Sequence, residues 1–183
     1  MTSAFSEGYH SPAILWKQHL QRGLEEDAWV YDWTTLGLGP NAYEKKVRAK
    51  IVAKAPGVWA AQGLLEAAQA VSREMGWTLE LRSCVPPSAR VNPGQVLSEW
   101  EGPVRAILAL ERPFLNLASY VCGIASQTKG LVAVVDQQWK SSDWHTRSAA
   151  PRVTATRKTL PGYRDLALEG VLAGGGMSHR YNL

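Results

Sequence analysis

Hydrophobic positions in the first hundred residues follow two kinds of spacing. In residues 14–26 and 64–75 they recur every three or four positions, which predicts two amphipathic helices. In residues 45–54 and 77–82 hydrophobic and polar positions alternate, which predicts strands with one buried and one solvated face. A further strand is expected over residues 95–101, so the first part of the chain is predicted to be a mixed α+β layer.

Glycine and proline residues mark the expected ends of these helices and strands. Gly37-Leu-Gly-Pro40 is expected to break the chain after the first helix, and Pro56-Gly57 to turn it after the first strand. Gly76 stands where the second helix should end.

A long helical pattern starts at Val104 and meets Pro113. A proline inside a helix costs about 3 kcal/mol unless it opens a new helix at its first turn, so a kink or a break is expected there. The helical pattern resumes over residues 125–135, and the polar residues 137–151 are predicted to form a loop.

The last part of the chain shows the pattern with which a βα barrel begins. A short strand is predicted over residues 153–156, a helix over 166–172 and the start of a second strand over 178–183. The sequence therefore predicts an α+β fold. An N-terminal open-faced α/β sandwich domain, residues 1–113, is followed by the first units of an incomplete βα barrel, residues 114–183.

Composition places the chain among soluble intracellular proteins. It is 45% hydrophobic and 20% charged, with a net charge of +4 and two cysteines that lack metal-ligand spacing. Both cysteines stand in apolar contexts, which favours buried free thiols in a reducing compartment. The first ten residues are polar and no apolar run is long enough to span a bilayer, so a cytoplasmic location is expected.

Positive charge gathers toward the C-terminus. From residue 147 onward the only acids are Asp165 and Glu169, whereas the basic residues are Arg147, Arg152, Arg157, Lys158, Arg164, His179 and Arg180. Such an excess suits a small anionic substrate, particularly where low-dielectric walls focus the field. A solvated basic patch explains the same composition, so charge alone does not choose between the two.

Three motifs follow one another in the second half of the chain. They are Leu110-Glu-Arg-Pro-Phe-Leu-Asn116 with Cys122-Gly-Ile-Ala-Ser126, then Thr156-Arg-Lys-Thr-Leu-Pro-Gly-Tyr-Arg164, then Gly174-Gly-Gly-Met-Ser-His-Arg-Tyr-Asn-Leu183. In this order and spacing they resemble the quinolinate phosphoribosyltransferase family, with its E-R-x-x-L-N and S-G-I-A, T-R-K-T-x-P-G-x-R and G-G-x-x-x-H-R-x-x-L. Weaker similarity extends back to about residue 24, so the resemblance covers most of the chain.

The resemblance implies a pocket for two anionic substrates, quinolinate and phosphoribosyl pyrophosphate. It places Arg157 and Lys158 at the end of the first barrel strand, and His179 and Arg180 at the second, on the rim where βα barrels hold their active sites. Lys158 and His179 are the implied catalytic residues, and guanidinium forks match the carboxylates of quinolinate. By the same carry-over, Arg112 reaches into a neighbouring subunit's pocket, which implies a homodimer or a larger oligomer.

The chemistry implied by the resemblance needs no protein nucleophile. The ring nitrogen of quinolinate attacks the anomeric carbon of the donor, pyrophosphate leaves, and the adjacent carboxylate is lost as carbon dioxide. Positioning and charge stabilisation then supply the catalysis. Mg²⁺ is expected on the pyrophosphate, with its protein ligands outside this chain, so no Cys/His metal cluster is expected within it.

Residue type alone supports plainer interpretations. An Arg-Lys pair after a strand, such as Arg157 and Lys158, is usually solvated, and a lone histidine such as His179 is more often structural. Arg112 on a helix can simply pair with a nearby acid, and His19 is interpreted as a surface residue. The motif context favours the functional interpretation.

Departures from the family's pattern keep alternatives open. About seventy residues follow Pro113, enough for roughly two of eight βα units, and Leu160, Ala167-Leu-Glu169 and Asn182 differ from the family's residues. We therefore expect a truncated product, an incomplete gene model, or a fragment that needs another polypeptide. The main alternative is a non-catalytic homologue that acts only as a dimerising fragment. A transferase for another pyridine or pyrimidine acid is a further alternative, and a small basic nucleic-acid-binding protein ranks last.

Overall fold

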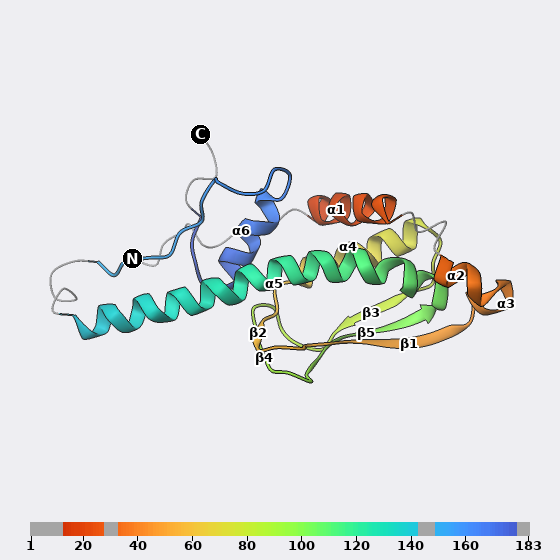
Figure 1. Cartoon of the computed structure of the whole chain (residues 1–183), viewed down its shortest axis with the longest axis horizontal. Helices are drawn as coiled ribbons and strands as arrows, with labels where there is room; N and C mark the ends of the chain where they lie inside the picture. Colours follow the sequence, from red (N-terminus) through yellow and green to blue (C-terminus); the bar gives the residue numbers. More distant parts are fainter. Residues whose placement is uncertain (1–12, 28–32, 143–148, 179–183) are drawn as a thin grey trace.

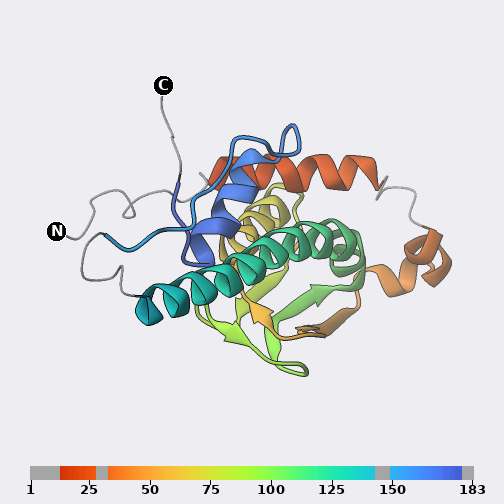
Figure 2. The ribbon, with the colours of Figure 1, turned by 60° about the vertical axis from the view of Figure 1, so that its left-hand side comes forward.

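The computed structural model describes residues 13–27, 33–142 and 149–178, and its larger helices lie on one side of a small sheet (Figure 1). The turned view shows α5 and α4 next to the sheet, with α1 beyond them (Figure 2). In chain order the elements are α1 (Ala13–Glu26), α2 (Trp33–Leu38), α3 (Pro40–Tyr43), β1 (Lys46–Val52), β2 (Gly57–Val58), α4 (Gln62–Glu74), β3 (Glu80–Ser83), β4 (Arg90–Val91), β5 (Val96–Pro103), α5 (Val104–Ser141) and α6 (Arg164–Ala173).

The sheet has three antiparallel strands in the order β1-β5-β3. In β1 exposed and half-buried side chains alternate as the sequence predicts. Trp100 of β5 lies opposite Ala49 of β1 and is buried, and its ring meets Phe114 of α5 edge-on at 4.9 Å between ring centroids. The predicted strand 77–82 begins later, at Glu80, although Trp77 is buried.

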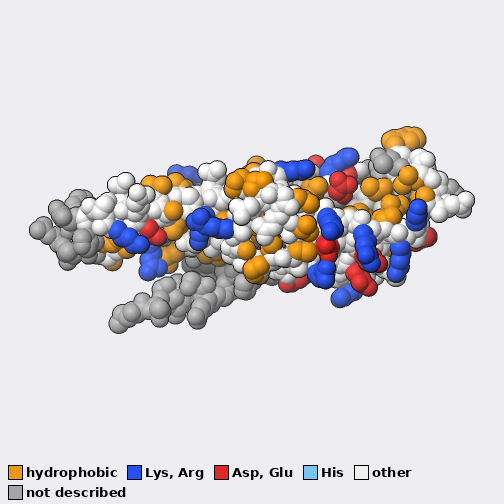
Figure 3. Space-filling model, turned by 90° about the horizontal axis from the view of Figure 1, so that it is seen from below, with side chains coloured by type: hydrophobic (Ala, Val, Ile, Leu, Met, Phe, Trp, Pro, Cys, Tyr) orange, Lys and Arg blue, Asp and Glu red, His pale blue; other side chains and the backbone are white. Residues whose placement is uncertain are grey.

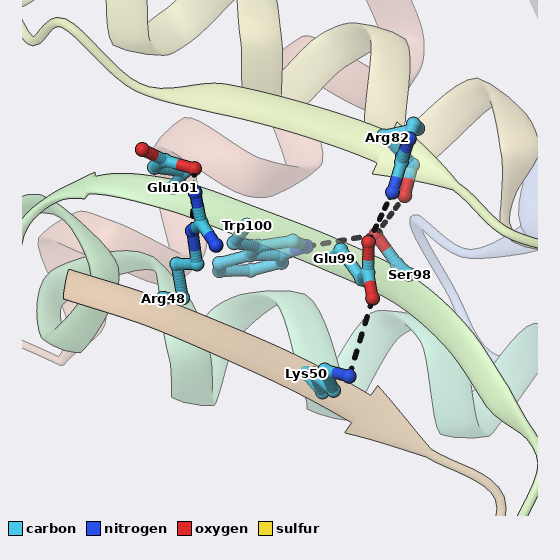
Figure 4. A network of polar contacts seen from close by, with 7 residues as sticks. All are labelled: Arg48, Lys50, Arg82, Ser98, Glu99, Trp100 and Glu101. Atoms are coloured by element: carbon cyan, nitrogen blue, oxygen red, sulfur yellow. Dashed lines mark hydrogen bonds and ion pairs between the residues drawn. The ribbon is translucent and has the colours of Figure 1, made fainter.

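The other face of the sheet carries charged side chains that pair across the strands (Figures 3 and 4). Arg48 donates to Glu101 at 2.8 Å, while Glu99 pairs with Lys50 at 3.3 Å and with Arg82. Each exposed pair contributes little to stability. The charges on the edge strand β1 do, however, oppose edge-to-edge association. The sheet with helices on one face and paired charges on the other confirms the predicted open-faced α/β sandwich.

The helix α5 runs without interruption through Pro113, so a break there, one of the two predicted alternatives, is wrong, while a kink stays a prediction. Pro113 is buried where α1 crosses, since a Cβ added at Gly23 would lie 3.1 Å from the proline Cβ. Packing against α1 offsets the backbone hydrogen bond that a proline cannot donate. The loop predicted over residues 137–151 starts later than expected, because α5 continues to Ser141. The residues at this end are polar because they are exposed.

Short elements occupy segments for which the sequence predicts none. α2 includes Gly37 and α3 begins at Pro40, so the expected break is confined to Gly39, whose φ is 76°. The strands β2 and β4 pair with each other through Gly57 and Val91. Gly76, with φ 69°, follows α4 as predicted.

The C-terminal segment contains the start of a parallel barrel. Instead of the strand predicted over residues 153–156, there is a single parallel bridge between Thr154 and Met177. Two backbone hydrogen bonds flank it, from Ala155 to the Met177 carbonyl at 2.7 Å and from Met177 to the Val153 carbonyl at 2.9 Å. The helix α6 between them matches the predicted one and packs on α5. The described residues therefore hold one βα crossover and no closed barrel.

Candidate functional site

Arg112 lies on the exposed side of α5. Its guanidinium Nη1 donates to Oδ1 of Asp27 at 2.8 Å, and the side chain is 71% exposed. The nearby acid that the plainer interpretation allows is therefore present, and it comes from the residue after α1.

Arg157 and Lys158 are both exposed in the turn that leads from Thr154 to α6. The Lys158 amide donates to Oγ1 of Thr156 at 3.2 Å, and Nη2 of Arg164 donates to the Arg157 carbonyl at 3.4 Å. The backbone of this turn is thus held from both sides, and the two cationic side chains are left in solvent.

His179 and Arg180 lie outside the described residues, as does Asn182. The convergence of these two residues with Arg157 and Lys158 on one cavity therefore stays a prediction.

A cluster that the sequence did not indicate joins α1 to α6. Nε1 of Trp16 donates to Oε2 of Glu169 at 2.7 Å, and Nε2 of His19 lies 3.1 Å from Oδ2 of Asp165. The His19 ring also lies beside the Tyr163 ring, tilted by 37° with ring centroids 5.3 Å apart. His19 is thus a bridging residue between helices, contrary to its interpretation as a surface residue. No local pattern reveals this, because the partners stand 146 positions or more apart.

Burial and charge act together on the tyrosine beside this cluster. Burial raises the pKa of Tyr120, and the nearby Tyr163 and Asp165 raise it further. Its ring lies edge-on to Tyr163 with centroids 5.5 Å apart. Because the pKa of Tyr120 is raised, the phenol is neutral at neutral pH.

An apolar groove of about 860 Å³ runs between the end of β1 and α5. Hydrophobic side chains gather in this part of the surface beside the charged face of the sheet (Figure 3). Arg112, Arg157 and Lys158 do not line it. The groove is therefore separate from the cationic residues that the motifs indicate.

The Cys122-Gly-Ile-Ala-Ser126 motif has a structural role at this groove. The Val58 amide donates to Oγ of Ser126 at 2.9 Å, and the Ala60 amide donates to Sγ of Cys122 at 3.3 Å. Burial raises the pKa of the Cys122 thiol, so it stays protonated. Cys84 is exposed and Cys122 is half-buried, which corrects the expectation that both thiols are buried.

The Gly174-Gly-Gly176 run allows a close approach of backbones. A Cβ at Gly174 would lie 2.5 Å from the Ala125 carbonyl oxygen, and one at Gly176 would lie 2.6 Å from Cγ1 of Val171. The run therefore lets the chain leave α6 tightly packed on α5.

Within residues 13–27, 33–142 and 149–178 no three His, Cys, Asp or Glu side chains are grouped so that they could hold a metal ion. By length and composition alone α5 could cross a membrane, contrary to the expectation from the sequence. One such helix is weak evidence, because the core helix of a soluble protein meets the same criteria, and 44% of this apolar window is buried inside the molecule.

The structural class is defined by two parts: an open-faced α/β sandwich and, joined to it by one long helix, a crossover of the kind with which a parallel barrel begins. Two family models match it in succession: the N-terminal domain of quinolinate phosphoribosyl transferase over residues 32–122 and its C-terminal domain over residues 124–183. The chain belongs to the quinolinate phosphoribosyltransferase family. The two models meet inside the continuous α5, and the division after residue 113 stays a prediction.

The relatives found by sequence similarity are named for the same activity. A probable carboxylating nicotinate-nucleotide pyrophosphorylase of Bacillus subtilis is 31% identical over 140 residues, which cover 76% of this chain and 44% of that protein. The human carboxylating nicotinate-nucleotide pyrophosphorylase is 33% identical over 163 residues, covering 87% and 48% respectively. The chain thus spans about half the length of the relatives it matches.

Solved structures agree with the fold. The nicotinate-nucleotide pyrophosphorylase of Ehrlichia chaffeensis superposes with a TM-score of 0.74 at 25% identity, over 100% of this chain and 57% of that one. The enzyme of Francisella tularensis gives a TM-score of 0.77 at 22% identity over 98% and 57%, which supports the fold alone.

Proposed function

We propose that this chain supplies part of the active site of a quinolinate phosphoribosyltransferase. The reaction transfers phosphoribosyl from phosphoribosyl pyrophosphate to quinolinate and, after decarboxylation, gives nicotinate mononucleotide for NAD biosynthesis. Membership of the family and the names of the relatives support this assignment.

The parallel bridge between Thr154 and Met177 carries the proposal. The cationic pair 157–158 begins three residues after Thr154, and the pair 179–180 begins two residues after Met177. Because the bridge is parallel, the two segments run in the same direction and lead to the same edge. That edge is where βα barrels bind their substrates.

The roles of these residues follow from the charges of the substrates. We assign Arg157 and Arg180 to the two carboxylates of quinolinate, because guanidinium forks bind carboxylates bidentately. We assign Lys158 and His179 to catalysis. Positive charge there stabilises the departing pyrophosphate, and later the electron pair left on the ring when carbon dioxide departs.

Each bond change in this reaction is accounted for without a covalent enzyme intermediate. The ring nitrogen forms the new bond to the anomeric carbon as the bond to pyrophosphate breaks. The bond between the ring and its adjacent carboxylate then breaks, and the ring carbon takes up a proton. The protein's contribution is to hold two anions in reacting distance and to exclude competing geometries.

Arg112 supports an oligomer in the proposal. Its side chain points from α5 into solvent. A residue that contributes to a pocket in another copy of the chain must be exposed in this way. We therefore propose a homodimer or a larger oligomer. We also propose that it acts in the cytoplasm and binds neither nucleic acid nor membranes.

Mg²⁺ enters the proposal only as a companion of the donor. The described residues offer no cluster of metal ligands, so they do not fit a resident ion. Mg²⁺ prefers phosphate oxygens and keeps several waters, which suits binding on the pyrophosphate itself.

Quinolinate binding by the purified chain tests the proposal. Calorimetric titration should show quinolinate bound more tightly than nicotinate, which lacks one carboxylate. Arg157→Ala should weaken quinolinate binding about tenfold, the effect of losing a charge-assisted hydrogen bond. Arg90→Ala, which removes an exposed guanidinium from β4, is the matched control and should change nothing.

Two outcomes bear on the alternatives. Equal binding of nicotinate and quinolinate, or no binding of either, would overturn the proposal. Quinolinate binding without release of pyrophosphate is expected of a chain that supplies only part of the active site, whereas release of pyrophosphate when the donor is added would argue against the non-catalytic homologue.

A further inference from the structure

We propose that Asp27 is a positioning residue for Arg112. Its carboxylate holds one nitrogen of the guanidinium and leaves the remaining donors free for a substrate carboxylate. The inference rests on the proposed function, because it concerns the arginine assigned there to a neighbouring copy's pocket.

The close approach of α1 to α5 builds this contact. Gly23 lies one turn before Asp27, and a Cβ added there would lie only 3.1 Å from Cβ of Pro113, so the missing side chain allows the close approach of the two helices. The Asp27 amide donates to the Gly23 carbonyl at 3.0 Å, which continues the helical turn past the end of α1. The carboxylate is thereby carried to the turn of α5 that bears Arg112, beside the buried Pro113.

The two partners differ in how firmly they are held. The Asp27 side chain is 27% exposed and the Arg112 side chain 71%. The acid is therefore the fixed partner, and the long arginine side chain is the one that gains order from the contact. An unpaired arginine at this exposure would sample many rotamers, and each substrate encounter would have to select one.

The geometry of the guanidinium leaves it able to bind a second anion. Arginine has five N–H donors in a planar fork. The contact with Asp27 is made by Nη1 to a single oxygen at 2.8 Å, which is one-point pairing. The other edge of the fork is available to a carboxylate that arrives from solvent.

A competing effect opposes this role and decides the design of the test. A bound substrate carboxylate would lie near the Asp27 carboxylate, and the two negative charges repel. At an exposed site the repulsion is weakened by water and salt. We therefore expect the gain from ordering Arg112 to exceed the repulsion, and removal of Asp27 to weaken substrate binding.

Quinolinate affinity of the 183-residue chain provides the test, measured by calorimetry on the wild type and on five variants. Asp27→Ala should weaken quinolinate binding about two- to fivefold, the range expected for an exposed ion pair. Asp27→Asn keeps an acceptor oxygen and should lie between the wild type and Asp27→Ala. Arg112→Ala should weaken binding further. In the Arg112→Ala background, Asp27→Ala should have no additional effect, since a positioning residue acts only through its partner.

Glu26→Ala is the matched control, because it removes the adjacent exposed carboxylate and leaves the Asp27 contact in place. It should leave quinolinate affinity unchanged, whereas a general effect of negative charge would make it behave like Asp27→Ala.

Each outcome is decisive. Tighter or unchanged binding by Asp27→Ala and Asp27→Asn, or an equal loss with and without Arg112, overturns the inference. If the wild type binds quinolinate but the Asp27 variants give one of these contradicting results, the proposed function stands and only the role of Asp27 is rejected. If the wild type binds no quinolinate, the proposed function fails first and the inference fails with it.

Discussion

His19 on α1 and Asp165 on α6 face each other across 146 positions of sequence, with 3.1 Å between Nε2 and Oδ2. Three residues before His19, Trp16 reaches Glu169, which stands one helical turn after Asp165. Two helical faces therefore meet in matched pairs. Because α6 follows directly on the turn that carries Arg157 and Lys158, the N-terminal helix helps to set where that turn lies.

The first prediction concerns this connection. Trp16→Phe should lower the free energy of unfolding by about 1.5–3 kcal/mol, the usual contribution of a hydrogen bond to a charged group. The Trp16 side chain is 1% exposed, so water cannot replace the lost donor contact cheaply. Urea denaturation followed by circular dichroism measures the change.

Trp33→Phe is the control for that measurement, because Trp33 is 85% exposed on α2. It should change the free energy of unfolding by less than about 0.5 kcal/mol. Equal effects of the two substitutions would show that the pairing of α1 with α6 adds no stability.

Local sequence patterns predict the helices and strands that have one buried and one exposed face. The alternation in β1 and the helical spacing in α1 and α4 reflect one buried and one exposed face, which the sequence displays directly. Pro113 was interpreted through its cost to an isolated helix. In the molecule that cost is offset by a contact with Gly23, ninety positions earlier, which no local pattern contains.

The candidate site was predicted by a different route. Arg112, Arg157 and Lys158 were found by the motif resemblance, since their residue types alone are typical of solvated surface. The structure places all three in solvent, in agreement with either interpretation. The pairing of Arg112 with Asp27 depends on where α1 crosses α5, so it became visible only in three dimensions.

A second prediction compares two glycines on helices. A Cβ at Gly170 would lie 2.8 Å from Cβ of Ile124 and 2.9 Å from the Val121 carbonyl oxygen. Gly170→Ala should therefore destabilise the protein by about 1–3 kcal/mol, because α6 must move away from α5. An alanine at Gly123 would meet nothing within 4 Å, so Gly123→Ala should stabilise α5 by about 0.5–1 kcal/mol.

Thermal or urea unfolding of both glycine variants supplies the measurement. The opposite signs separate packing from helix propensity, which favours alanine at both positions. A gain in stability for both variants would contradict the close packing of α6 on α5.

The last prediction is a loss of stability at high pH that depends on Cys122. Burial raises the pKa of this thiol in the folded chain above its usual value of about 8.5, while in the unfolded chain it ionises normally. The unfolded state therefore releases its proton first as pH rises. Stability is fully present below pH of about 8.5 and falls above it, by up to about 1.4 kcal/mol per pH unit until the folded thiol ionises too.

Cys122→Ser should remove this contribution, because a serine hydroxyl does not ionise there and still accepts the hydrogen bond from the Ala60 amide. The difference in unfolding free energy between wild type and variant, measured at pH 7 and pH 9.5, should shift against the wild type at the higher pH. Tyr120, whose pKa is also raised, is present in both proteins and cancels in the comparison. A difference that does not change with pH would mean that Cys122 is as accessible to water in the folded chain as in the unfolded one.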